Sequence, residues 1–279
     1  MLKVTLLNND NVRKRNFFAE HGLSMFIETA DCKILFDTGQ TSLFHKNAMT
    51  LGLDLTQINA VVISHGHYDH TGGIPEFCRI NSQAPIYAHP EIISKKWKAP
   101  KKCCIDEREE IGIPWGFNSK GISTERFQFH QKPVHLRENI LLSSTIPTVV
   151  GFEEFSGNLL VQGESGVLPD RHLDEQFMLV VIKDHAHLIL GCSHRGVANS
   201  IEYAKKLLPG KKLVSLIGGM HLENIPKERL ERTVHYLRQS GIQTIIPLHC
   251  TGFDATVEIK KAFGPKCMIH GTGDTIELG

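Results

Sequence analysis

The chain has no CxxC pair, no apolar run long enough to cross a membrane and almost no net charge. Its seven cysteines are an odd number scattered over a long sequence, so we expect reduced thiols and no disulfide framework. The missing CxxC spacing argues against a conventional iron–sulfur cluster. A net charge of +1 gives no support for a nucleic-acid or membrane partner. The first residues become polar too soon for a signal peptide, so we expect a cytoplasmic protein.

The overall composition is that of a compact globular protein. Hydrophobic residues make up 41 % and charged residues 22 % of the sequence, which is ordinary for a folded domain. A chain of 279 residues can bury a large core, and we expect one domain over 1–279. Cys32, Cys78 and Cys267 stand among apolar residues and are expected in that core.

Apolar runs and turn residues predict an alternation of strands and helices. Pro226 near the start of one expected helix and Gly241 just past its end fit the usual asymmetry of helix termini. The expected strands are 2–7, 24–28, 33–37, 60–64, 84–88, 187–191, 213–217, 244–247 and 267–270. The expected helices are 74–80, 197–208, 226–240 and 254–263.

Three histidines and an aspartate lie within six residues, directly after the apolar run 60–63. In an extended segment His65 and His67 project to the same side and can hold one metal ion. Asp69 and His70 follow in a turn, and they can bind a second ion beside the first. A chance cluster of polar loop residues is the alternative.

Other histidines follow apolar runs much later in the chain. His194, His221 and His249 each come shortly after an expected strand. In α/β sheets, ligand sites gather at the carboxyl ends of strands. Residues about 180 positions apart are therefore expected to meet in one cleft.

The cluster around His65 resembles the HxHxDH signature of the metallo-β-lactamase superfamily, and Asp37-Thr38-Gly39 resembles that superfamily's first motif. Further short motifs are similar to one branch, which includes the archaeal dihydropterin-methyl-ribofuranosyl-aminobenzene-phosphate synthases; they are residues 20–24, 191–196, 218–222 and 247–252. The resemblance runs from about residue 2 to the C-terminus. It implies an αββα sandwich, an α/β fold of two facing mixed sheets with helices on both outer sides.

The resemblance also implies a centre for two divalent metal ions. We assign His65, His67 and His194 to one ion, and the other ion to a second set made of Asp69, His70 and His249. Zinc is the first expectation, with iron and manganese as alternatives. Each ion would keep room for water or substrate.

Two residues near the expected metal centre, Cys192 and Asp37, belong to neither of the assigned ligand sets. Members of the superfamily usually carry an aspartate that bridges both ions, whereas here Cys192 follows Gly191. Cys192 is either a thiolate bridge or a small buried residue. Asp37 is expected to accept hydrogen bonds from loop amides or from a ligand imidazole, without touching a metal ion.

The branch motifs suggest residues that act on the substrate. His21 and His221 are candidates to hold a substrate phosphate or to act as acid or base, with structural histidines as the alternative. Asp69 and His221 are the candidate catalytic residues. The run Asp174-Glu175-Gln176 resembles another short acidic motif of the branch, and it is predicted, with Asp174 first, to contact the substrate or to support the cleft. His185 and His187 are expected to be solvated turn residues.

An insert at about 92–140 departs from the alternating pattern. Residues 95–102 contain five lysines, which predict a solvated face or a lid that attracts an anionic substrate. Trp97 or Trp115 could stack on a flat ring in the lid interpretation.

Two enzymatic functions and one binding function remain open on this basis. Metal-generated hydroxide would hydrolyse phosphoesters, lactams or thioesters. A synthase would instead stabilise a diphosphate leaving group while an aromatic carbon attacks a pterin methylene. An iron-binding redox or electron-carrier protein on the same fold is the third possibility. The expected partner is a phosphorylated or otherwise anionic small molecule, and the sequence leaves the oligomeric state open.

Overall fold

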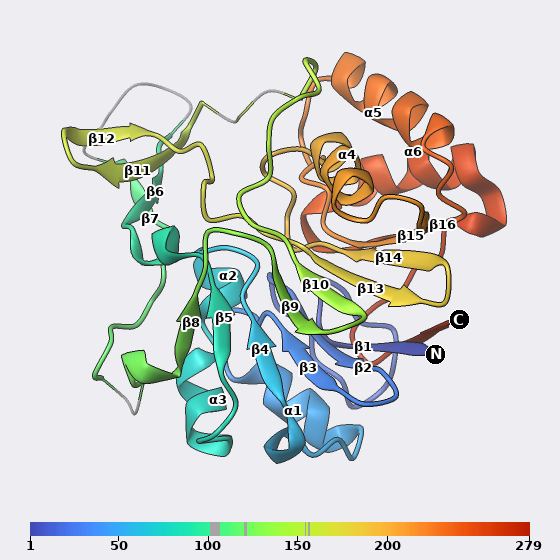
Figure 1. Ribbon diagram of the computed structural model, residues 1–279. Coiled ribbons are helices and arrows are strands. Elements are labelled where there is room, and N and C mark those ends of the chain that lie inside the picture. Colours follow the sequence, from blue (N-terminus) through green and yellow to red (C-terminus); the bar gives the residue numbers. More distant parts are fainter. Residues whose placement is uncertain (101–106, 120–121, 154, 156) are drawn as a thin grey trace.

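The computed structural model of the protein describes residues 1–100, 107–119, 122–153, 155 and 157–279 (Figure 1). Two mixed sheets form its centre. The order of the first sheet is β17 (Thr275–Leu278), β1 (Leu2–Asn8), β2 (Ser24–Glu28), β3 (Lys33–Phe36), β4 (Ala60–Val62), β5 (Ile86–Ala88) and β8 (Phe127–Phe129). The order of the second is β16 (Thr244–Pro247), β15 (Lys212–Gly218), β14 (His185–Ile189), β13 (Met178–Ile182), β10 (Ile140–Leu142) and β9 (Val134–Arg137).

The two sheets face each other across a shared apolar core. Alternate strand residues point to opposite faces of a sheet, and the inward-facing ones interdigitate. Val4, Met25 and Phe36 of the first sheet share one buried cluster with Leu142 and Ile217 of the second, and all are fully buried.

Helices cover both outer faces of this sandwich (Figure 1). The first sheet packs against α1 (Leu43–Thr50) and α3 (Ile74–Ile80). The second packs against α4 (Val197–Leu207), α5 (Lys227–Gln239) and α6 (Phe253–Phe263). The predicted αββα sandwich is therefore confirmed.

A smaller sheet extends from one end of the sandwich and was not predicted (Figure 1). Its order is β12 (Gly166–Pro169), β11 (Leu159–Gly163), β6 (Lys96–Lys98) and β7 (Glu109–Glu110). The expected insert at 92–140 is thus divided, because β8 belongs to the first main sheet and β9 and β10 belong to the second. Whether the remaining part acts as a lid stays a prediction.

The C-terminal strand lies later than expected. In place of the expected strand 267–270, Cys267 forms only an isolated bridge to Ile245, and the chain then turns at Gly273, whose φ is +87°. The last strand, β17, pairs antiparallel with β1. Among the described residues, no helix has the length and apolar character needed to span a membrane.

Candidate metal centre

Three buried histidines converge from the two main sheets. His65 and His67 lie in the loop after β4, and His194 lies in the loop after β14. The Nε2 atom of His65 is 3.0 Å from Nδ1 of His67 and 3.3 Å from Nε2 of His194. Burial lowers the pKa of each ring, to about 3 for His67. Neutral imidazoles with nitrogens this close are suited to share one metal ion.

A second donor set lies beside the first. Asp69 and His70 belong to the short helix α2 (Tyr68–Thr71), and His249 begins the 3₁₀ turn η5 (His249–Thr251) after β16. The Nε2 atom of His249 is 3.2 Å from Oδ2 of Asp69 and 3.3 Å from Nε2 of His70. The pKa of Asp69 is lowered despite its burial, by the imidazoles of His70 and His249, so the carboxylate is ionised.

Hydrogen bonds on the outer side of the histidines fix their orientation. Nδ1 of His70 is 2.7 Å from Oδ2 of Asp37, and Nδ1 of His249 is 2.7 Å from Oδ1 of Asp10. A carboxylate only accepts hydrogen bonds, so Nδ1 of His70 and Nδ1 of His249 each carry a proton. Nε2 of His249 in turn faces Oδ2 of Asp69 at 3.2 Å, so the same reasoning places a proton there as well. This arrangement fits a bound cation, which would take the place of the proton between His249 and Asp69.

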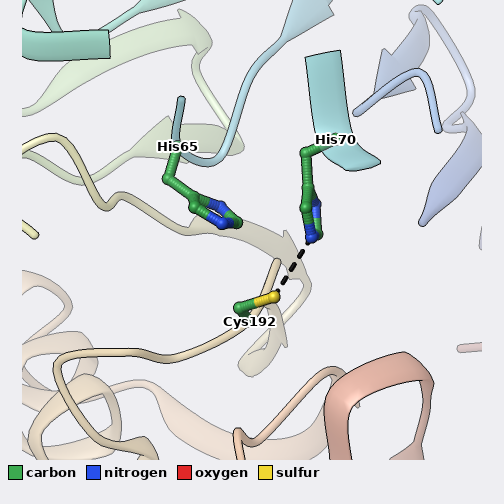
Figure 2. A group of neighbouring side chains, drawn as sticks. All are labelled: His65, His70 and Cys192. Atoms are coloured by element: carbon green, nitrogen blue, oxygen red, sulfur yellow. Dashed lines mark hydrogen bonds between the residues drawn. The ribbon is translucent and has the colours of Figure 1, made fainter. Parts of the chain in front are cut away.

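Cys192 lies close to one histidine of each donor set, His65 and His70 (Figure 2). Its Sγ atom is 3.1 Å from Nε2 of His70, and the ligand atoms of His65, His70 and Cys192 all lie within 4.8 Å of one another. Burial raises the pKa of this thiol. The geometry allows a thiolate shared between two ions, and metal binding by Cys192 stays a prediction.

A cleft of about 690 Å³ opens above these donors. Side chains from the β6–β7 arm, from the segment around Phe152 and from the start of α5 form its walls. The floor of the cleft is formed by four residues of the two donor sets: His67, Asp69, His194 and His249. Residues of both donor sets therefore face the same cleft.

A family model of the metallo-beta-lactamase superfamily matches residues 18–210, more than half of the chain. The chain belongs to the metallo-beta-lactamase superfamily. A curated relative from Methanocaldococcus jannaschii, described as uncharacterized, is 29 % identical over 94 % of this chain and 94 % of its own length. A second relative from that organism is named 7,8-dihydropterin-6-methyl-4-(beta-D-ribofuranosyl)-aminobenzene-5'-phosphate synthase. It is 29 % identical over 86 % of this chain and 83 % of its own.

Among solved structures, a superfamily protein called Tm1679 is similar over nearly its whole length. It is described as a metal-dependent hydrolase of the beta-lactamase superfamily, with 27 % identity and a TM-score of 0.85, covering 100 % of this chain and 99 % of that one. YhfI from Bacillus subtilis, at 14 % identity and a TM-score of 0.58 over 99 % of this chain and 100 % of its own, shares the metallo-beta-lactamase fold.

The other predicted site residues of this superfamily member differ in how deeply their side chains are buried. His21 is exposed in the cleft, with Nδ1 3.1 Å from Asp10 and Nε2 3.3 Å from Asp69. The hydrogen bond with Asp10 raises the pKa of His21. His221 also lines the cleft, and its ring centre is 4.2 Å from that of His194. Substrate contact by these two residues stays a prediction.

Asp174 supports the loop after β4 that contains His65 and His67. It is fully buried, its Oδ2 accepts a hydrogen bond of 2.7 Å from the backbone N–H of Gly66, and its Oδ1 is 3.0 Å from Lys96 Nζ. Asp174 is therefore in the supporting position that we gave as its alternative role, and it does not line the cleft.

Several residues of the site had not been identified from the sequence. Asp10 orients His249, and its only signal was a polar residue at the end of the first strand. His172 stacks on His194 with ring centres 4.3 Å apart. It does not follow an apolar run, so strand-end reasoning missed it. Glu175, by contrast, stands in the acidic motif 174–176, for which we expected substrate contact or support of the cleft. It accepts a hydrogen bond of 2.6 Å from the backbone N–H of His194, and burial raises its pKa to about 7.

The expected solvation of the lysine run and of His187 was wrong in part. Lys95 and Lys98 are exposed, whereas Lys96 is buried between Asp170 and Asp174. Lys101 and Lys102 lie outside the described residues, as do Cys103 and Cys104. His185 is exposed as expected, but His187 is buried inside β14, where Nδ1 is 2.8 Å from Ser215 Oγ.

The two tryptophans lie in different surroundings. Trp115 is buried among Phe117 and Phe127, and its Nε1 donates a hydrogen bond to the carbonyl of Thr71. It therefore belongs to the core and cannot stack on a substrate ring. Trp97 is half-buried, and the guanidinium of Arg108 lies 4.8 Å from its ring centre.

Proposed function

We propose that this protein is a metal-dependent enzyme with a two-ion centre that acts on a phosphorylated or otherwise anionic small molecule. The observation that carries the proposal is the orientation of the ligand imidazoles. Asp37 and Asp10 each hold an outer ring nitrogen at 2.7 Å, which turns the Nε2 atoms of His70 and His249 toward Asp69. Such carboxylate–histidine pairs are a common feature of protein metal sites.

The two donor sets differ in charge, which affects what each can hold. His65, His67 and His194 form a neutral set, whereas Asp69 adds a negative charge to His70 and His249. Nitrogen and carboxylate donors suit zinc first, with iron and manganese as alternatives. Bound divalent ions would supply Lewis acidity and a nucleophile at neutral pH.

We infer that the reaction is a hydrolysis. Support comes from the metal-dependent hydrolase at 27 % identity with a TM-score of 0.85. Asp69 stands at the cleft floor, and His21 on the wall above it can deliver a proton to a leaving group, since Asp10 raises its pKa. His221 faces the same space and is the second candidate for acid–base work.

A condensation with release of diphosphate is the second candidate, and a specific relative favours it. The synthase from M. jannaschii is 29 % identical over most of both chains. The walls of the cleft also carry the cationic side chains of Lys98 and Arg232 and the aromatic rings of Phe152 and Phe155. These side chains are of the kind that bind a diphosphate and a flat ring.

One set of assays separates these functions. The metal-loaded protein is incubated with phosphodiester, lactam and thioester substrates, and separately with a pterin diphosphate and an aminobenzene partner. Product from the first group, lost in His67→Ala, supports hydrolysis; diphosphate release only from the second group supports the synthase. If all substrates are inert and a visible absorption band bleaches on reduction, both enzymatic proposals are wrong and the protein is an iron-binding redox protein.

A further inference from the structure

Two thiols meet at the floor of the cleft although their strands are not neighbours. Cys192 follows β14 and Cys250 lies in η5 after β16, and β15 runs between these two strands. The ligand atoms of Cys192, His249 and Cys250 lie within 4.8 Å of one another, so the two sulfurs are at most that far apart. Sγ of Cys250 also donates to the backbone carbonyl of Cys192 at 3.4 Å.

A glycine at the end of the intervening strand makes this meeting possible. A Cβ atom on Gly219 would lie 2.6 Å from Sγ of Cys250 and 3.2 Å from Cα of Cys192. Any side chain at this position would therefore occupy the space through which Cys250 reaches Cys192. The backbone N–H of Gly219 also bonds to the carbonyl of Gly191 at 2.8 Å, which holds the end of β15 against the residue before Cys192.

These two thiols differ from the other described cysteines in their access to small molecules. Both Cys192 and Cys250 line the cleft, even though each is more than nine-tenths buried. Cys32, Cys78 and Cys267 each belong to a hydrophobic cluster instead. A small oxidant that enters the cleft can thus reach two thiols that face each other.

We propose that Cys192 and Cys250 form an oxidisable pair that closes to a disulfide when the protein meets hydrogen peroxide. One sulfur, as thiolate, attacks a peroxide oxygen; the O–O bond breaks, hydroxide leaves and takes up a proton to become water, and a sulfenic acid remains. The other sulfur attacks this sulfenic sulfur, the S–S bond forms and a second water leaves. The thiols lose two electrons and the peroxide gains them.

Closure requires the sulfurs to approach to about 2.05 Å, which side-chain rotation must provide. In the disulfide, the Cys192 sulfur would be bonded to Cys250, whereas in the reduced protein it lies 3.1 Å from Nε2 of His70. Oxidation would therefore change the junction of the two donor sets. This consequence rests on the proposed metal centre, but formation of the disulfide does not.

The test uses the full chain, reduced, treated with chelator and then exposed to stoichiometric hydrogen peroxide. Remaining thiols are blocked with iodoacetamide before non-reducing digestion and mass spectrometry. We expect an intact mass about 2 Da lower before blocking, a linked peptide pair containing residues 192 and 250, and full reversal by dithiothreitol. C192S and C250S should each lack the linked pair, and C267S should behave like the wild type.

Two results would overturn the inference. One is recovery of Cys192 and Cys250 as separately blocked thiols after peroxide treatment. The other is a linkage of either residue to Cys103 or Cys104, which the C103S/C104S variant would abolish. A disulfide that forms in a protein binding only one metal ion would contradict the two-ion proposal and leave this inference standing.

Discussion

Asp37 is the buried residue on which the second donor set depends. Its Oδ2 is 2.7 Å from Nδ1 of His70 and accepts a hydrogen bond of 2.7 Å from the Ser64 hydroxyl, while Oδ1 accepts the backbone N–H of Ser64. One carboxylate thus orients a ligand of the second set and the residue preceding His65. Its φ of +56° keeps it in a left-handed turn that only a short polar side chain or glycine adopts readily.

Replacing Asp37 by asparagine should weaken the binding of one metal ion. The amide can direct an N–H at Nδ1 of His70, which would favour the wrong ring tautomer. Loss of such an outer partner typically costs about 10- to 100-fold in metal affinity. Competition with a chromophoric chelator measures this loss, and Asp31→Asn at an exposed turn is the control. Equal affinities in the two variants would show that Asp37 does not orient His70.

At the scale of elements, β6 links the small sheet to the loop after β4, through Lys96 and Asp174. Lys96 is buried, with Nζ 2.7 Å from Asp170 and 3.0 Å from Asp174, and these two carboxylates raise its pKa. Asp174 in turn holds the backbone of Gly66 between the two ligand histidines. Through Lys96, the small sheet therefore supplies the positive charge that pairs with Asp174, and Asp174 in turn holds the loop after β4.

Lys96→Met should destabilise the protein strongly. It leaves two buried carboxylates without their cation, and breaking a buried ion pair in this way costs about 3–5 kcal/mol. Lys95→Met is the matched control because Lys95 is exposed on the same segment. Urea unfolding of both variants measures the difference. If they unfold at the same urea concentration, Lys96 does not stabilise this arrangement.

Strand β14 contains a histidine that should make stability depend on pH. Burial lowers the pKa of His187 to about 4, so the folded state keeps this ring neutral while the unfolded chain protonates below about 6.5. The unfolded state then binds more protons, and stability falls as the pH drops from about 6.5 toward 4. This loss should be smaller in His187→Gln.

The measurement is urea unfolding of chelator-treated protein at several pH values, so that metal release does not contribute. The difference in unfolding free energy between wild type and H187Q should shrink as the pH falls. His185→Gln, at an exposed position of the same strand, should follow the wild type. A difference that stays constant from pH 7 to pH 4 would contradict the assignment.

At the scale of the whole molecule, the layered sandwich could be predicted but the small sheet could not. Strands such as β1 and β4 and helices such as α3 follow from local apolar patterns, and the family resemblance supplied their arrangement. The pairing of β6 with β11 joins segments more than sixty residues apart, with no local signal in either. The run 267–270 looked like a strand, yet only Cys267 pairs.

In the candidate site, too, residues that stand together in the sequence could be predicted, whereas partners from distant segments could not. His65, His67, Asp69 and His70 stand together in the sequence, so their grouping needed little beyond spacing. Their supporting partners could not be found in this way. Lys96 read as solvated because its neighbours are lysines, whereas the carboxylates that bury it lie 74 and 78 residues away.

The number of metal ions per chain tests the central claim most directly. The protein is purified without added metal, reconstituted with zinc, freed of excess and examined by elemental analysis. We predict about two ions per chain in the wild type and about one in His67→Ala, with the fold of the variant retained in its circular dichroism spectrum. One ion or fewer per wild-type chain would contradict the two-ion centre.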